Sequence, residues 1–422
     1  MSTAATPAPS AKMPSAVLLL IVASLVLTIS SGLRQSLGLF LPPMAKEGMS
    51  ASVFSFGVAL LSIVWGISQP VIGMLADKFG TRMVLIGTAL VYALGLVVMA
   101  QVPGALGLNL GAGLLMGMGV AGTGLGVLMG TVSRAVPPEK RSQTVGTVAA
   151  LGSLGTLVLA PVGQQLINGF GWRGAALGFA AIAAVMAVVA LAIRSEPSAT
   201  GVTGAASAGD EFTLPEVLKA AMSHKGYLAM TAAFFACGFQ LMFITVHLPS
   251  YLVGCGLPPT MGATAIGIIG LCNTLGTYVV GLLGARYAQR RLLALVYLLR
   301  TSIIVAFLAL PVTTESTIVF AAAMGLLWLS VAPLVSGLVG RVFGLKHFST
   351  LYGIVFLSHQ VGSFCGVMMG GLVYDFTGGY GPAWIGLIAI GTIAFLLQWP
   401  MDDRPLARKP VAGAPQPAGQ PA

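Results

Sequence analysis

Apolar runs that are long enough to cross a membrane recur along the whole sequence. Of the 422 residues, 56% are hydrophobic and 8% are charged, whereas roughly 25% of the residues of a soluble domain are charged. This composition excludes a soluble globular protein. Because one crossing needs about 20 apolar residues, the runs predict an all-α membrane protein with twelve transmembrane helices. The spans are expected near residues 15–43, 52–75, 83–101, 106–132, 144–167, 174–193, 227–253, 262–284, 292–311, 317–341, 350–374 and 382–400.

The predicted spans form two groups of six, and a polar linker separates the groups. The linker begins with a run of Ser, Thr, Ala, Gly and Pro residues and is predicted to end in a short amphipathic helix that lies along the membrane. Two related halves are typical of transporters that bind their substrate between the halves. The expected parts are a cytoplasmic tail over 1–14, a first half over 15–193, the linker over 194–226, a second half over 227–400 and a disordered tail over 401–422.

The distribution of cations predicts the orientation. Lys46 and Arg173 fall on one side of the membrane and Arg34 and Arg300 fall within spans, whereas the rest of the 21 Lys and Arg residues fall on the other side. Because cytoplasmic loops carry the excess of Lys and Arg, both termini are expected in the cytoplasm and the spans in a bacterial inner membrane. Topology therefore explains the net charge of +10, with the lipid bilayer as the partner and no nucleic acid.

The sharpest local motif follows the second span. Gly residues allow a tight turn between two helices, and a carboxylate and cations stand near the helix ends. The motif resembles the loop signature of the major facilitator superfamily, which implies two pseudo-symmetric six-helix halves. A weaker copy 208 residues later has Ala285 in place of Asp77, so we expect any charge latch to be stronger in the N-terminal half. The residues of the two copies are Gly73, Asp77, Lys78, Gly80 and Arg82, and then Gly281, Arg286 and Arg290.

Two further segments carry a more specific resemblance. Residues 235–249, which include the run Phe235-Ala236-Cys237-Gly238-Phe239-Gln240, and residues 359–375 are similar to bacterial members of the monocarboxylate porter and oxalate:formate exchanger group. The resemblance implies transport of a small organic anion. In the better-known relatives the eighth span carries an Arg that meets the substrate carboxylate. Here the segment from Asn273 to Thr277 has no cation. The way in which those relatives bind the substrate carboxylate is therefore not expected for this chain.

Two cations within the predicted spans point to a negatively charged substrate. All 11 acidic residues fall at loops or span ends, and a charge within a membrane costs several kcal/mol unless it is solvated or paired. Arg34, beside Gln35, is the expected anion clamp, since the first helix lines the cavity in the superfamily. The alternative is that Arg34 extends to the outer interface. Arg300 in the ninth span is expected to have a structural role.

The remaining polar residues within spans are candidates for the other walls of the site. The alternative for these residues is hydrogen bonding between helices without substrate, and the alternative for Trp328 is simple packing. A neutral His can donate to a carboxylate or carry a coupled proton, which makes His247 and His359 the proton-coupling candidates. The candidates are Gln240, His247, Asn273, Thr277, Trp328, His359, Gln360 and Ser363.

Enzymatic motifs are not apparent in the sequence. It contains no P-loop, no metal cluster and no nucleophile elbow, so no enzyme activity, cofactor or metal is expected. The prediction is a secondary active or facilitative carrier that moves a small organic anion, expected to be a monocarboxylate, by alternating access as a monomer; proton coupling, exchange for a counter-anion and uncoupled uptake are the open alternatives. The alternatives are an exporter of neutral or cationic amphiphiles and, with less support, a receptor without flux.

Overall fold

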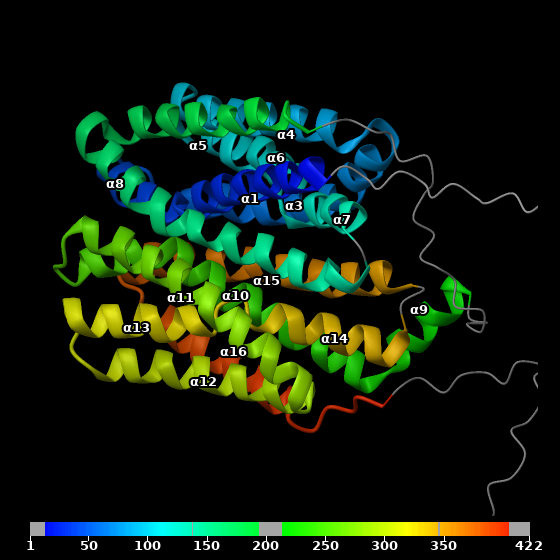
Figure 1. Ribbon diagram of the computed structural model, residues 1–422. Coiled ribbons are helices and arrows are strands. Elements are labelled where there is room, and N and C mark those ends of the chain that lie inside the picture. Colours follow the sequence, from blue (N-terminus) through cyan, green and yellow to red (C-terminus); the bar gives the residue numbers. More distant parts are fainter. Residues whose placement is uncertain (1–12, 137, 194–212, 345–346, 405–422) are drawn as a thin grey trace, which may run out of the picture.

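The computed structural model describes residues 13–136, 138–193, 213–344 and 347–404. In this part of the chain every regular element is a helix. Residues 1–12 of the predicted N-terminal tail, residues 194–212 of the linker and residues 405–422 of the predicted C-terminal tail lie outside the described residues. Figure 1 shows the N-terminal helices, coloured blue to cyan-green, packed as one bundle against the green-to-red helices of the C-terminal half.

The N-terminal half contains the first six crossings. Its elements are α1 (Met13–Gln35), the 3₁₀-helix η1 (Leu37–Phe40), α2 (Leu41–Lys46), α3 (Ala51–Phe79), α4 (Thr81–Gln101), α5 (Gly104–Leu108), the π-helix η2 (Asn109–Leu115), α6 (Met116–Thr123), α7 (Leu125–Ala135) and α8 (Pro138–Ala190).

The C-terminal half contains the remaining crossings and a short helix that precedes them. Its elements are α9 (Leu214–Ser223), α10 (Lys225–Gly254), α11 (Pro259–Arg286), α12 (Gln289–Ala309), α13 (Thr314–Leu326), α14 (Val331–Phe343), α15 (Phe348–Thr377) and α16 (Gly381–Gln398). The short helix α9 begins at a capping box in which Thr213 Oγ1 and the Thr213 backbone N–H both bond Glu216.

The described residues contain 11 helical segments that are long and apolar enough to cross a membrane. One of them, Gly146–Ala190, has 45 residues, which is about twice the length that one crossing needs. It turns at Gly171, whose φ of 68° and ψ of 173° are not helical and suit only glycine. This segment is therefore two crossings, and the all-α fold with twelve spans is confirmed.

Three spans that were expected to be continuous are interrupted. The first gives way to η1 after Gln35, and within η1 Gly38 packs so closely on α10 that a β-carbon would meet the Thr245 carbonyl oxygen. The fourth includes the π-helix η2 and breaks again at Gly124, which is extended. The tenth is divided between α13 and α14. The first and last of these breaks position side chains discussed below.

The start of α1, the helix α9 and the end of α16 lie at the same end of the bundle (Figure 1). We name this the inner end, in keeping with the predicted orientation, and the opposite end the outer end. Each half has its own apolar core. At the outer end the Asp375 carboxylate of α15 accepts hydrogen bonds from the backbone N–H groups of Ala51 and Ser52, at 3.0 and 2.9 Å. It thereby caps the first turn of α3 across the interface between the halves.

Candidate functional site

Arg34 lies at the end of α1, where the first span breaks, and faces both halves of the molecule. Its guanidinium carbon is 5.1 Å from the centre of the Trp65 ring on α3. Its Nη1 donates to the Met242 sulfur on α10 at 3.7 Å. Arg34 is only partly buried, and in the described part of the chain no oxygen atom accepts a hydrogen bond from this guanidinium. The positive charge is thus held by a ring and a thioether alone.

Aromatic side chains continue from Arg34 across the interface between the halves. The Trp65 ring meets the Phe356 ring of α15 edge to face, with the centroids 5.4 Å apart. Phe356 stacks in turn on the imidazole of His359, with the ring centroids 6.2 Å apart. The centroids of the His359 imidazole and the Phe234 ring of α10 are 4.8 Å apart. Trp65 belongs to the N-terminal half, whereas the other three rings belong to the C-terminal half. We name the group of Arg34, Trp65, Met242, Phe356 and His359 the Arg34 cluster.

Polar side chains beside the Arg34 cluster bond to one another or to backbone. Gln35 donates to Thr156 Oγ1 at 2.9 Å, and the Trp65 indole donates to Gln69 Oε1 at 2.7 Å. Gln360 donates to the Ser62 carbonyl across the interface at 3.1 Å, and its Oε1 lies 3.1 Å from His359 Nδ1. These bonds give each of the three amide groups at least one protein partner.

Gln240 and His247 do not meet in one site. Gln240 is fully buried and donates to the Leu387 carbonyl of α16 at 3.0 Å, away from the interface. His247 is also fully buried, with Nε2 2.9 Å from the Val367 carbonyl and Nδ1 3.4 Å from the Tyr380 hydroxyl. Gln240 therefore holds helices of the C-terminal half together, whereas His247 also lies at the interface between the halves, with Nε2 3.5 Å from Ser55 Oγ of α3.

Asn273 joins three helices. Its Nδ2 donates to Ser153 Oγ of α8 at 2.9 Å, and its Oδ1 accepts from the Leu329 backbone N–H at 2.9 Å and from Thr277 at 3.1 Å. Asn273 is 3% exposed. Ser363 is buried, bonds the carbonyl of its own helix at His359 and faces α10. Asn273, Thr277 and Ser363 thus have protein partners, and none is described in contact with Arg34.

Arg300, unlike Arg34, is fully buried and has oxygen atoms as hydrogen-bond acceptors. Its Nε donates to the Leu327 carbonyl at 3.1 Å, Nη2 donates to the carbonyls of Leu327 and Trp328, and Nη1 donates to Cys237 Sγ at 3.2 Å. Leu327 and Trp328 follow the end of α13, where helical carbonyls lack partners and attract a cation. Arg300 thereby stabilises the break between α13 and α14.

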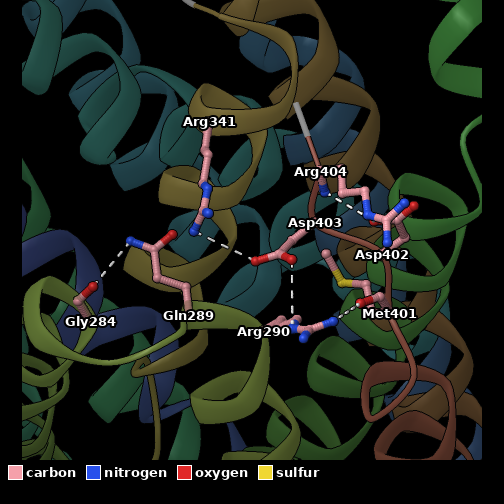
Figure 2. Close-up of polar contacts among 8 residues, drawn as sticks. All are labelled: Gly284, Gln289, Arg290, Arg341, Met401, Asp402, Asp403 and Arg404. Carbon is pink, nitrogen blue, oxygen red and sulfur yellow. Dashed lines mark hydrogen bonds and ion pairs between the residues drawn. The ribbon is translucent and has the colours of Figure 1, made fainter. Parts of the chain in front are cut away.

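The two copies of the loop motif differ in the segment that supplies an acidic side chain. The first copy contains its own acid, Asp77, whereas the second copy is contacted by an acid from another segment. In the first copy Gly80 has a φ of 85° and permits the turn between α3 and α4, while the Lys78 ammonium lies over the Phe79 ring. In the second copy, where Ala285 replaces the acid, Asp403 from the segment after α16 lies 3.6 Å from Arg290 (Figure 2).

The Asp403 contacts extend to a third segment. The same carboxylate lies 3.6 Å from Arg341 at the end of α14, and Arg290 also donates to the Met401 carbonyl at 3.0 Å. Figure 2 shows Asp403 between the two Arg side chains. The sequence comparison of the two copies did not identify this carboxylate, because Asp403 lies outside the repeat.

Sequence reasoning also missed Trp65, Gln69, Met242 and Phe356. A signal for two of them was present, since Trp65 lies in mid-span and Gln69 follows one helical turn later, where a polar residue is costly without a partner. Met242 and Phe356 look like ordinary apolar span residues, and only the packing of α10 and α15 brings them to Arg34.

Comparisons with known proteins support the fold. The sequence model of the Major Facilitator Superfamily matches residues 20–328. Monocarboxylate transporter 11 of Mus musculus is 28% identical over 371 residues, which cover 85% of this chain and 80% of that protein. The Escherichia coli (strain K12) protein named Uncharacterized MFS-type transporter YhjX is 25% identical and covers 76% of this chain and 79% of its own length. A solved bacterial homolog to the human lysosomal transporter Spinster, in an inward-facing and unoccupied conformation, has a TM-score of 0.75 at 13% identity and covers 93% of this chain and 99% of that chain.

Proposed function

Because the chain belongs to the Major Facilitator Superfamily and is a multi-pass membrane transporter, we propose that it carries a small organic anion by alternating access. The substrate is a monocarboxylate, bound between the halves at Arg34. The membrane is the bacterial inner membrane, and a monomer is the functional unit. A proton or a counter-anion moves with the substrate or against it.

The observation that carries this proposal is the Arg34 guanidinium without an oxygen partner. A cation–π contact contributes about 0.5–2 kcal/mol, whereas a charge within the membrane costs several kcal/mol. The ring of Trp65 and the sulfur of Met242 therefore offset only part of the cost. A carboxylate can accept two parallel N–H bonds from a guanidinium and would supply the missing charge.

The contrast with Arg300 explains why only one of the two cations within spans is assigned to the substrate. Arg300 already donates to two backbone carbonyls and a thiol, and it is fully buried. Every acidic residue in the described part of the chain lies at a helix end or in a loop. Arg34 thus combines a charge within a span, partial access and an interface position.

The names of relatives support an anion as the substrate. The mouse protein that is 28% identical to this chain is named a monocarboxylate transporter. In this chain the eighth span has Asn273 and Thr277 and lacks a cation, so Arg34 on the first span takes over the binding of the carboxylate. We assign His359 and Gln360 to the opposite wall, and Gln35 to the support of α1 through Thr156.

A coupled proton, where transport uses one, is assigned to His359. Its imidazole is partly buried and stacks on Phe356 of the Arg34 cluster. His247 is fully buried and both of its ring nitrogens lie near protein partners. A proton carrier must reach water or substrate in both states of the cycle, which favours His359. Gln240, Asn273, Thr277, Trp328 and Ser363 are assigned to packing between helices.

Flux measurements in proteoliposomes test the proposal. Purified protein should take up labelled monocarboxylates, Arg34→Gln should reduce kcat/KM at least 100-fold, and Arg34→Lys should retain part of the activity. Arg173→Gln is the matched control, since Arg173 is a surface cation paired with Glu47 at 2.9 Å. Unchanged uptake by Arg34→Gln would exclude the anion clamp. Uptake of amphiphilic cations that is indifferent to Arg34 would favour the exporter instead.

A further inference from the structure

We infer that the transported anion is a carboxylate that carries an aromatic ring. This inference rests on the proposed function, because it takes Arg34 as the group that binds the carboxylate. It assigns Trp65 and Phe356 as the residues that determine specificity for the rest of the substrate.

The first step concerns what surrounds the guanidinium. Trp65 lies against Arg34 at 5.1 Å and against Phe356 at 5.4 Å. The other described contact of the guanidinium is the Met242 sulfur, and thioethers pack favourably against aromatic rings. A carboxylate that reaches Arg34 therefore places the atoms next to it among rings and sulfur.

The second step concerns the polar groups that a substrate could use. A hydroxyl or a second charge on the substrate needs a partner, and a buried polar group without one is strongly disfavoured. Near Arg34 the amide of Gln35 bonds Thr156, Gln69 bonds Trp65, and Gln360 bonds the Ser62 carbonyl. Because one atom of each of these amides already has a protein partner, we expect short hydroxy acids to gain less there than an aromatic acid gains from the rings.

The third step concerns how a ring would fit. Trp65 and Phe356 now contact each other across the interface, so separation of the halves during transport exposes both rings. A substrate ring can occupy the position between them and keep both aromatic contacts. Each aromatic pair contributes beyond its buried area by a factor of about two to ten in affinity. An aromatic body thus binds both halves at once, whereas a short aliphatic acid binds chiefly at Arg34.

The chain offers a matched control for these rings. Phe56 and Phe364 form a second edge-to-face pair on the same two helices, α3 and α15, with centroids 6.3 Å apart. Phe56 stands nine positions from Trp65 toward the outer end of α3. A Phe56→Leu variant therefore removes an equivalent contact between the halves without altering the Arg34 cluster.

The experiment compares three labelled acids in proteoliposomes: benzoate, cyclohexanecarboxylate and lactate. Cyclohexanecarboxylate has the size of benzoate without its aromatic ring. We expect the KM for benzoate to be at least fivefold below that for cyclohexanecarboxylate and at least 20-fold below that for lactate. Phe356→Leu and Trp65→Leu should bring the benzoate and cyclohexanecarboxylate values within twofold of each other, whereas Phe56→Leu should preserve the difference.

The outcomes separate this inference from the proposed function. Equal KM values for benzoate and cyclohexanecarboxylate in the unmodified protein, or a preference for lactate, would overturn the inference. The proposed anion carrier would still stand if transport of these acids depended on Arg34. Loss of Arg34 dependence would overturn both. The comparison in the unmodified protein needs no variant to fold, and benzoate-dependent quenching of tryptophan fluorescence in Phe356→Leu and Phe56→Leu gives a second reading.

Discussion

Asn273 on α11 donates a hydrogen bond of 2.9 Å to Ser153 Oγ on α8, and this bond joins the two halves of the carrier. The carbonyl of the same side chain accepts the Leu329 N–H, where the tenth span is interrupted. One amide thus connects the contact between α8 and α11 to the break between α13 and α14.

Replacement of Asn273 should therefore affect stability more than substrate affinity. Asn273→Ala removes three hydrogen bonds, among them the one from the Leu329 N–H at the break of the tenth span, which costs about 1–3 kcal/mol. Thermal unfolding in detergent should show the loss. Thr277→Val, which removes only the bond to Asn273 Oδ1, is the control and should have a smaller effect. A KM effect in Asn273→Ala with unchanged thermal stability would place Asn273 in the binding site instead.

Arg300 and Arg34 should respond oppositely to neutralisation. Arg300→Met leaves the carbonyls of Leu327 and Trp328 buried without a donor, which should cost roughly 2–5 kcal/mol. Arg34→Met removes a charge whose cost within the membrane is only partly offset, so the free energy of unfolding should stay the same or rise while transport is lost. Thermal unfolding of the two variants side by side checks this, and equal losses would contradict the assignment of Arg300 to structure and Arg34 to substrate.

The Asp403 contacts should stabilise the inner end of the C-terminal half to a modest degree. Asp403→Asn weakens the contacts with Arg290 and Arg341, and partly exposed ion pairs contribute about 1 kcal/mol or less. We expect a small decrease in Tm and faster hydrogen exchange in α14. Asp402→Asn is the control, since Asp402 pairs with the exposed Arg404 at 3.8 Å. Equal exchange in both variants would show that Asp403 does not hold α14.

The turn at Gly171 should not tolerate a side chain. Its backbone lies in a region that costs non-glycine residues about 1–3 kcal/mol, so Gly171→Ala should lower the Tm even though a β-carbon meets no atom within 4 Å. Gly169→Ala tests the same loss of glycine two residues earlier, at a position with ordinary φ and open space. We expect no decrease for Gly169→Ala, and equal stability of both variants would argue against the strained turn.

The two candidate histidines should be separable by the pH dependence of transport. His359→Gln should flatten the pH profile of uptake where a proton is coupled, because His359 adjoins the Arg34 cluster. His247→Gln should lower the Tm and leave the shape of the profile unchanged, since His247 is buried between Val367 and Tyr380. Uptake at graded pH with and without an ionophore measures the difference. A profile altered only in His247→Gln would reverse the assignment.

The sequence allowed the fold to be predicted well because the hydrophobic runs and the repeated loop motif depend on local composition. The family and the all-α fold are confirmed. The breaks were not predicted. After the end of α1, Gly38 packs closely on α10, and the division of the tenth span depends on Arg300 from another helix. Contacts between distant segments leave little trace in a single sequence.

The candidate site shows the same limit. Helical spacing places Gln240 and His247 on the same face of one helix, but it does not identify the groups that this face contacts. In the structure Gln240 contacts the Leu387 carbonyl and His247 contacts the Val367 carbonyl. Arg34 was identifiable because a cation within a span is rare. Phe356 of α15, which contacts the Trp65 ring beside Arg34, became identifiable only once the packing of the two halves was known.

The cap that Asp375 places on the first turn of α3 has a consequence for the living cell. Any motion that parts α3 from α15 at the outer end has to release both backbone bonds, from Ala51 and from Ser52. The loss of both bonds adds to the activation free energy for separation of the halves at the outer end. A membrane that stores energy as ion gradients depends on such barriers. A carrier that is open at both ends would let ions pass and dissipate the gradients.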